Sequence, residues 1–147
     1  MTGNRVSYTL DSTLDSVNTA EEAAEQLAAK AGFSEEECQK ISMAVREAAV
    51  NAVLHGNAYD PNKKMTVSYE NTGESLVVTI ADQGRGLDPK DIPDPLAPEN
   101  LLKQSGRGIF LMRSFMDEVR IRTLQPGTEF TLIKRRGPAA KTKEASK

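Results

Sequence analysis

The chain is predicted to be an α+β protein, because segments with helical periodicity occur beside pairs of β-rich runs that are joined by short turns. Two such pairs are present: residues 65–69 with 76–80, and residues 118–123 with 129–134. The turn within each pair contains glycine, which is typical of an antiparallel hairpin. Helical periodicity runs through residues 34–56 and begins again after Gly106. The sequence therefore predicts helices combined with antiparallel hairpins.

The N-terminal part is predicted to form a strand over residues 6–10 and a short amphipathic helix over residues 20–30. The main helix follows. Ser34 can cap its N-terminus, and Glu37 stands three residues later, where it can complete a capping box. Gly56 can end this helix in the left-handed conformation.

The main helix is expected to be buried on two sides, because its apolar residues form two strips. One strip contains Ile41, Val45, Ala48 and Ala52, and the roughly opposite strip contains Met43, Val50 and Leu54. Glu47 and Asn51 are one turn apart and project together from the seam between the strips. A carboxylate in that position needs a functional reason, although the E-x-x-x-N pattern alone is short and common on exposed helix edges.

Asp82 is the second candidate site residue, because it follows directly after the β-rich run that ends at Ile80. A carboxylate there can accept a hydrogen bond from an exocyclic amine such as that of adenine. Gly84 and Gly86 remove side chains where a ligand must come close. Taken alone, D-x-G-x-G is equally compatible with a plain turn.

Two further glycine motifs follow. Gly106-Arg107-Gly108 precedes a helix whose core face is expected to contain Ile109, Met112, Met116 and Val119. Glycines at a helix N-terminus suit phosphate, because free N–H groups and the helix dipole point at it. Gly127-Thr128 joins the last two strands, and the hydroxyl of Thr128 can join a base-binding network.

Together, in this order and spacing, the four motifs resemble the Bergerat-type ATP site of the GHKL superfamily, which includes gyrase, the ninety-kilodalton heat-shock chaperones, histidine kinases and MutL. More narrowly, residues 47–56 and 105–119 resemble the anti-sigma-factor serine-protein kinases of bacterial sporulation and stress switches. The resemblance covers roughly residues 6–136. It implies a two-layer α/β sandwich with helices on one face of a mixed, mostly antiparallel sheet.

The resemblance also implies residue roles. Glu47 would be the general base, Asn51 the Mg²⁺ ligand and Asp82 the adenine-binding carboxylate. The close-approach glycines would be Gly84, Gly86, Gly106 and Gly108, and Thr128 would support the base through water. One position departs from the pattern: an arginine usually precedes the S-G-x-G run, and here that residue is Gln104. Arg107 and Lys103 are the candidates for the missing phosphate cation.

The segment from Leu87 to Gln104 contains four of the seven prolines and cannot be a continuous helix or an interior strand. In the superfamily this position is the lid over the ATP phosphates, and an inert surface loop is the alternative. No P-loop motif and no Cys/His ligand cluster occur in the sequence, so the expected cofactors are ATP and the Mg²⁺ that accompanies it.

Composition agrees with one cytoplasmic domain. The chain has 147 residues, a single cysteine and no apolar run long enough to span a membrane. Residues 1–136 are expected to form the domain, and residues 137–147 a basic, disordered tail. Because the rest of the chain is acidic, this tail is not expected to bind nucleic acid directly.

The function expected from the resemblance is an ATP-dependent protein-serine/threonine kinase that phosphorylates a STAS-domain anti-anti-sigma antagonist and sequesters a sigma factor or similar regulator. A homodimer is left open. A nucleotide-gated binding module without turnover is the main alternative, and Gln104 favours it. An ATPase coupled to mechanical or repair work lacks its further domains here. Histidine autophosphorylation is not expected, because no dimerisation helix precedes the domain and a structural role is favoured for His55, the sole histidine.

Overall fold

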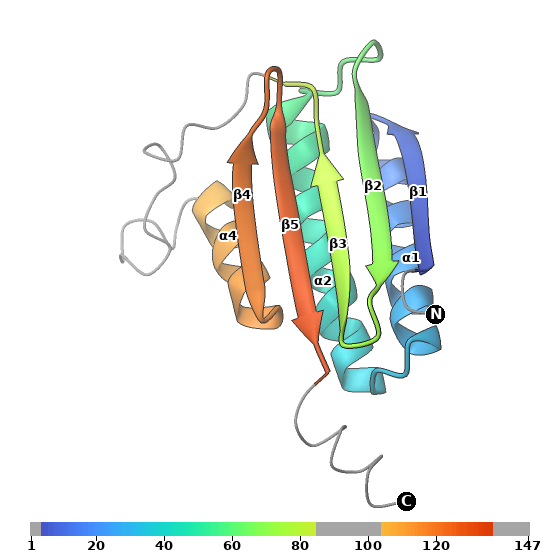
Figure 1. Cartoon of the computed structure of the whole chain (residues 1–147). Helices are drawn as coiled ribbons and strands as arrows, with labels where there is room; N and C mark the ends of the chain where they lie inside the picture. Colours follow the sequence, from blue (N-terminus) through green and yellow to red (C-terminus); the bar gives the residue numbers. More distant parts are fainter. Residues whose placement is uncertain (1–3, 85–103, 137–147) are drawn as a thin grey trace, which may run out of the picture.

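The computed structural model describes residues 4–84 and 104–136, with the side chains of residues 4 and 104–107 left aside. Its strands form one five-stranded sheet (Figure 1). They are β1 (Asn4–Asp11), β2 (Lys64–Asn71), β3 (Ser75–Ala81), β4 (Glu118–Thr123) and β5 (Thr128–Arg135). The strand order is β1-β2-β3-β5-β4, and every pairing among these strands is antiparallel. Both hairpins expected from the sequence are confirmed.

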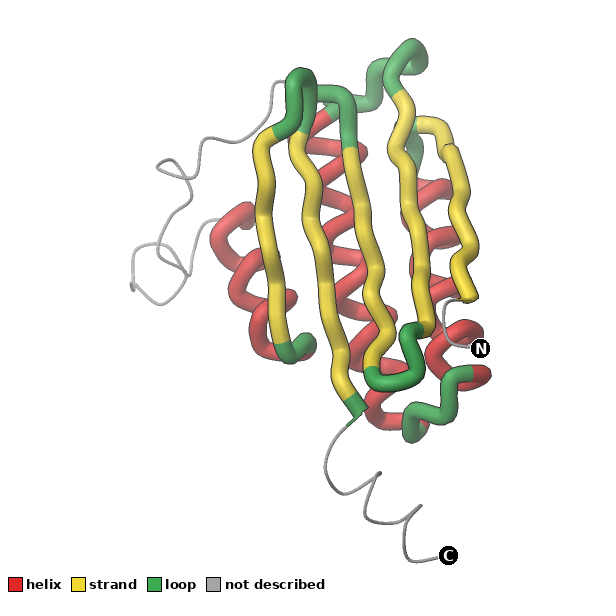
Figure 2. Tube along the Cα trace, in the orientation of Figure 1, coloured by secondary structure: helices red, strands yellow, loops and turns green. Residues whose placement is uncertain are grey.

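The helices lie together on one face of this sheet, so the α+β sandwich is confirmed (Figures 1 and 2). They are α1 (Leu14–Lys30), α2 (Glu35–Val50), the π-helix η1 (Asn51–Gly56) and α4 (Gln104–Phe115). α2 is central, because it packs against α1 on one side and α4 on the other. The alternating burial of β2 and β3 reflects this arrangement, since every second side chain faces the helices.

The core between the two layers combines small residues, most of them alanines of α1 and α2, with larger side chains from the strands and helices. Ala20, Ala24 and Ala28 of α1 are fully buried, so this helix approaches the sheet closely. Tyr69 of β2 is 1% exposed and donates its hydroxyl hydrogen to the carbonyl oxygen of Ala20, 2.7 Å away. That hydrogen bond satisfies a phenol that would be costly to bury without a partner.

The start of α2 agrees with the sequence in detail. Ser34 is the N-cap, its side chain accepts a hydrogen bond from the backbone N–H of Glu37, and Glu37 completes the capping box. The end of the helix differs. Instead of stopping at a left-handed glycine, the chain continues from Asn51 to Gly56 as a π-helix, and Gly56 does not have a positive φ. The expected capping role of Gly56 is therefore wrong.

Two expected core assignments also need correction. Met43 is 47% exposed, so the second apolar strip of the main helix does not form a second buried face. The buried residues of α2 include the small Ala44 and Ala49 instead. Val119 was expected on the core face of the helix after Gly108, but α4 ends at Phe115 and Val119 lies in β4.

Arg136, the last described residue, contacts two other parts of the domain. Its Nε donates to the carbonyl oxygen of Gly73 in the β2–β3 turn, its guanidinium also donates to the carbonyl oxygen of Ala31, and it lies over the ring of Phe33. The Arg136 side chain thus joins the α1–α2 connection to the β2–β3 turn. The expected tail, residues 137–147, lies outside the described residues. Among the described helices, none is long and apolar enough to cross a membrane.

Candidate functional site

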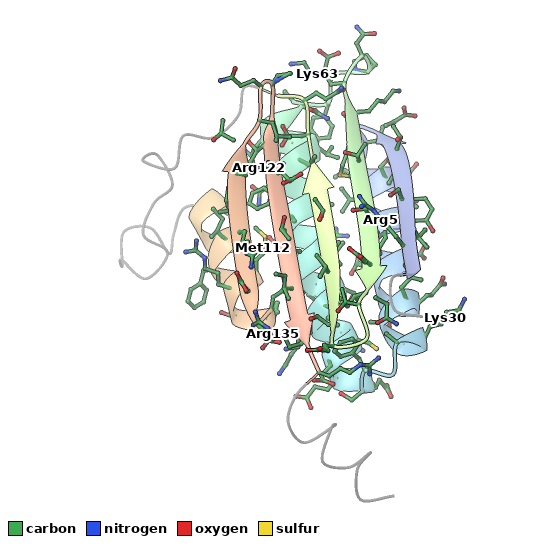
Figure 3. All side chains as sticks on the ribbon, viewed as in Figure 1. Arg5, Lys30, Lys63, Met112, Arg122 and Arg135 are labelled. Atoms are coloured by element: carbon green, nitrogen blue, oxygen red, sulfur yellow. The ribbon has the colours of Figure 1, made fainter. Side chains whose placement is uncertain are left out.

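The candidate site lies at the end of the sheet where β3 ends and β5 begins. Three connections meet there: the loop after η1, the segment after β3 and the β4–β5 turn (top of Figure 2). Lys63, at the end of the first connection, marks this edge in Figure 3. Asp82 is the first residue after β3, and its backbone N–H extends the ladder by donating to the carbonyl oxygen of Thr128 at 3.0 Å.

Asp82 is a buried carboxylate, only 4% exposed. Its Oδ1 accepts hydrogen bonds from the backbone N–H groups of Gly84 at 2.9 Å and Thr128 at 3.2 Å. Among the described residues, no donor reaches Oδ2. Burial raises the pKa of the Asp82 carboxyl, and the two N–H donors and the charge of Lys63 oppose that rise in part. The carboxylate is thus short of partners for its charged form, and an amine of a ligand could provide one.

Three glycines enclose Asp82. A Cβ atom on Gly56 would lie 2.3 Å from Oδ2 of Asp82, and one on Gly127 would lie 1.9 Å from its carbonyl oxygen. A Cβ atom on Gly84 would lie 2.0 Å from the carbonyl oxygen of Gly56. No real Cβ atom tolerates such contacts, so each of these positions requires glycine. Gly127 also has φ +109°, which favours glycine independently.

Glu47 and Asn51 form the second part of the site, on the last turn of α2 and the first residue of η1. Both are partly buried. The Nδ2 atom of Asn51 donates to the carbonyl oxygen of Glu47 at 3.0 Å, which leaves the amide oxygen Oδ1 for another partner. A π-helical segment changes the angular spacing of successive side chains, and such segments are frequent at functional sites.

Gly108 of α4 faces this pair. A Cβ atom on Gly108 would lie 3.1 Å from Oε1 of Glu47 and 3.4 Å from Nδ2 of Asn51. Gly108 therefore lets α4 approach α2 at the level of these two polar side chains. The structure thus brings together Glu47, Asn51 and Gly108, as the sequence analysis required. The π-helix then connects this group to Gly56, which lies against the carboxylate of Asp82.

Thr128 lies close to Asp82, and its expected support of the base through water stays a prediction. It is 3% exposed and donates its backbone N–H, rather than its hydroxyl, to the carboxylate.

Gly86, Lys103 and the expected lid up to residue 103 lie outside the described residues. Gln104, Gly106 and Arg107 belong to the first turn of α4. His55 is exposed near the end of η1.

Gly127 was not predicted to be a structural requirement, and Gly56 was predicted to have a different role. No role was predicted for Asn57, which is fully buried. A signal for Gly127 was available, because this residue stands beside Thr128. The contacts of Gly56 and Gly127 with Asp82 could not be predicted, because these glycines are 26 and 45 positions away from Asp82 in the sequence.

Residues 10–134 match the family model described as the histidine kinase-like ATPase domain. The chain belongs to this family. Its membership of the GHKL superfamily, expected from the four motifs, is confirmed. This match covers nearly all of the described core, and it includes the Asp82 and Glu47 groups.

Within this family, the chain is similar to proteins named as anti-sigma factors and serine-protein kinases. The chain is 36% identical over 104 residues to an anti-sigma F factor of Anoxybacillus flavithermus, a match that covers 67% of this chain and 70% of that protein. It is 34% identical over 101 residues to the serine-protein kinase RsbW of Bacillus licheniformis. That match covers 65% of this chain and 63% of the kinase, so it spans less than two thirds of the relative.

Solved structures share the fold. A structure of the RsbU and RsbW domains of a Mycobacterium tuberculosis protein superposes with a TM-score of 0.67 at 23% identity, covering 90% of this chain and 32% of that chain. The catalytic domain of histidine kinase ThkA superposes with a TM-score of 0.59 at 13% identity, covering 90% of this chain and 99% of that chain. At these identities the likeness concerns the fold.

Proposed function

We propose that this chain is an ATP-dependent protein-serine/threonine kinase that acts as an anti-sigma-factor-type switch. The observation that carries the proposal is the pairing of two groups: a buried, glycine-enclosed carboxylate at Asp82 and the Glu47–Asn51 pair opposite Gly108. The names of the similar proteins, an anti-sigma F factor and serine-protein kinases, support it.

Asp82 is the proposed contact to adenine. Its Oδ1 is occupied by two backbone N–H groups, so the carboxylate has a fixed orientation, and Oδ2 can accept a hydrogen bond from the exocyclic amine. Guanine presents a carbonyl oxygen at that position, and two acceptors would then face each other. Gly84 and Gly86 are proposed to line this part of the site, with Thr128 supporting Asp82.

The residues present fit a magnesium ion held together with the nucleotide phosphates. The amide oxygen of Asn51 is the kind of ligand that Mg²⁺ accepts, and the expected remaining ligands are phosphate oxygens and water. When bound, the ion would neutralise charge on the phosphates. Glu47, one turn away from Asn51, is the proposed base that accepts the proton of the substrate hydroxyl.

The terminal phosphate needs a cation, and Arg107 is proposed to provide it. Arg107 stands between Gly106 and Gly108 in the first turns of α4, where helix N–H groups favour anions. A guanidinium can bridge two phosphate oxygens, which a lysine reproduces poorly. Gln104 occupies the position where an arginine was expected. That substitution favours the second candidate function, a nucleotide-gated binding module without phosphoryl transfer.

The proposed partners follow from the proposed activity. They are a STAS-domain antagonist that is phosphorylated on serine, and a sigma factor or similar regulator that is sequestered. A second copy of the chain is a further proposed partner, and the proposed location is the cytoplasm. These proposals extend the names of the similar proteins to this chain.

The Glu47→Gln variant tests the kinase proposal, because glutamine keeps the size of glutamate and loses its basicity. We expect it to bind Mg·ATP normally and to transfer phosphate about 10²–10⁴ times more slowly. Purified wild type and variant would be incubated with Mg·ATP and each STAS-domain protein of the source organism, and phosphoserine would be counted by mass spectrometry.

Glu36→Gln is the matched control. Glu36 lies on the same helix, its side chain is 80% exposed, and its loss should leave the rate unchanged. If wild type phosphorylates a STAS-domain protein and Glu47→Gln does so at the same rate, the assignment of Glu47 is wrong. If wild type binds nucleotide and phosphorylates none of them, the binding module becomes the better description.

A further inference from the structure

Asn57 is a fully buried polar residue directly after η1, and nothing in the catalytic scheme above uses it. Its neighbour Gly56 contacts the carboxylate of Asp82 so closely that no side chain fits between them. Asn57 is thus next in sequence to one wall of the proposed adenine site. The chain turns sharply after it, since Ala58 and Tyr59 both have positive φ angles.

The amide of Asn57 bonds to three separate segments of the chain. Its Oδ1 accepts from the backbone N–H of Gln83 at 2.8 Å. Its Nδ2 donates to the carbonyl oxygen of Lys64 at 3.0 Å and to Oγ of Ser12 at 2.8 Å. These contacts use both amide hydrogens and the oxygen, so the orientation of the side chain is fixed.

Gln83 is held at a second point. Its Oε1 accepts from the backbone N–H of Lys64 at 2.6 Å, so both its main chain and its side chain are tied to the start of β2 and the end of η1. Ser12 lies on the side of Asn57 away from Gln83 in this set of contacts, and it donates to the carbonyl oxygen of Lys63 at 2.6 Å. The Gln83 side chain is exposed, so this second tie lies at the surface, whereas the Asn57 tie is buried.

The contacts that hold Gln83 also restrict its two neighbours in sequence. Asp82 precedes it and Gly84, whose N–H donates to the Asp82 carboxylate, follows it. A fixed Gln83 therefore fixes both the carboxylate and one of its two donors. If Gln83 moved, the N–H of Gly84 would move with it, and Thr128 would be the one remaining donor of the two that hold the carboxylate.

We propose that Asn57, together with Gln83, is the positioning residue that holds Asp82 in the orientation that distinguishes adenine from guanine nucleotides. This inference rests on the proposed role of Asp82 as the adenine contact. It predicts that a change at Asn57 alters the ratio of two affinities, whereas a purely structural residue would change stability and leave that ratio as it is.

The test compares ADP and GDP affinities by calorimetry, with Mg²⁺ present, for wild type and three variants. Asn57→Ala removes all three amide contacts. We expect its preference for ADP over GDP to fall about tenfold or more, the loss expected from one misplaced hydrogen bond. Gln83→Ala removes only the exposed tie, and it should lower the preference by a smaller factor.

Ser12→Ala is the matched control. It removes one bond to Asn57 and one to Lys63, and it leaves the contact between Asn57 and Gln83 in place. It should lower the urea midpoint and keep the preference for ADP. Asp82→Asn serves as the reference for complete loss of the preference.

The outcomes distinguish the adenine role of Asp82 from the positioning role of Asn57. If wild type shows no preference for ADP, the adenine role of Asp82 itself is wrong. If wild type prefers ADP and Asp82→Asn does not, but Asn57→Ala keeps the full preference, the positioning role is overturned. Should Asn57→Ala fail to fold, Gln83→Ala decides, because an unchanged preference in that variant contradicts the joint positioning role of Asn57 and Gln83.

Discussion

At Asp82, burial and hydrogen bonding act on the carboxylate in opposite directions. Burial raises its pKa, the N–H groups of Gly84 and Thr128 lower it, and burial is the larger effect. The ionised carboxylate is therefore less stable in the folded chain than in water. A residue of this kind reduces the stability of the fold, and perturbed carboxylates of this kind are concentrated at functional sites.

The pH dependence of Asp82→Asn follows from this direction. Because the folded-state pKa lies above the unfolded-state value, the stability contributed by the neutral carboxyl is complete below the unfolded-state pKa and is lost as pH rises through the folded-state pKa. Asparagine stays neutral and can still accept from both N–H groups through Oδ1. We expect the variant to gain stability relative to wild type as pH rises from about 4 to about 7.

Urea unfolding at several pH values measures this difference. Glu22→Gln, at an exposed position on α1, is the control and should show a much smaller trend. A difference between Asp82→Asn and wild type that stays constant across this pH range would mean that the carboxyl has an ordinary pKa in the folded chain.

Among the elements, η1 connects the two halves of the site. Its first residue is Asn51 and its last is Gly56, so the proposed metal ligand and the glycine that lies against Asp82 belong to one six-residue segment. A regular α-helix over the same residues would rotate Gly56 and Asn57 away from their present partners. The π-helix is therefore part of the site geometry.

The Gly56→Ala variant tests the close approach of η1 to Asp82. On helix propensity alone, alanine would be favoured over glycine by about 0.5–1 kcal/mol. The added Cβ atom, however, would lie 2.3 Å from Oδ2 of Asp82, so one of the two must move. We expect the affinity for ADP to fall at least tenfold.

Gly73→Ala provides the comparison for Gly56→Ala. Gly73 lies in the β2–β3 turn with φ +94°, at the opposite end of β3 from Asp82, so alanine there should destabilise the fold without changing the affinity for ADP. Equal affinities of wild type and Gly56→Ala in calorimetry would show that Asp82 tolerates displacement by η1.

Elements could be predicted from the sequence where the residues that determine them are close together in the chain. The capping box of Ser34 and Glu37 and the hairpin between β2 and β3 are set by residues a few positions apart, and both were predicted. The π-helix was not predicted, because no residue type marks the change from α to π. Gly56 was interpreted as a helix cap, since its reason for being glycine is a contact with Asp82, far along the chain. Met43 was expected to be buried, because periodicity cannot tell which of two apolar strips has a neighbour.

On the scale of the whole molecule, the site is assembled from parts that meet only in the folded state. α2, η1 and α4 bring Glu47, Asn51 and Gly108 together, while the end of β3 and the start of β5 bring Asp82 and Thr128 together. A ligand that contacts all of these binds the folded chain and not the unfolded one. Its binding energy is then added to the stability of the fold.

Nucleotide should therefore raise the melting temperature of the chain in a base-dependent way. At a free ADP concentration of about 100 times its Kd, binding adds about 2.7 kcal/mol. For a domain of this size that corresponds to a rise of roughly 5–11 °C. GDP at the same concentration should give a smaller rise, since its carbonyl oxygen faces the acceptor at Asp82, and ADP should give little rise with Asp82→Asn. Differential scanning calorimetry in Mg²⁺-containing buffer measures all three, and equal rises with ADP and GDP would contradict a base contact through Asp82 while leaving phosphate binding near Gly108 as the source of the stabilisation.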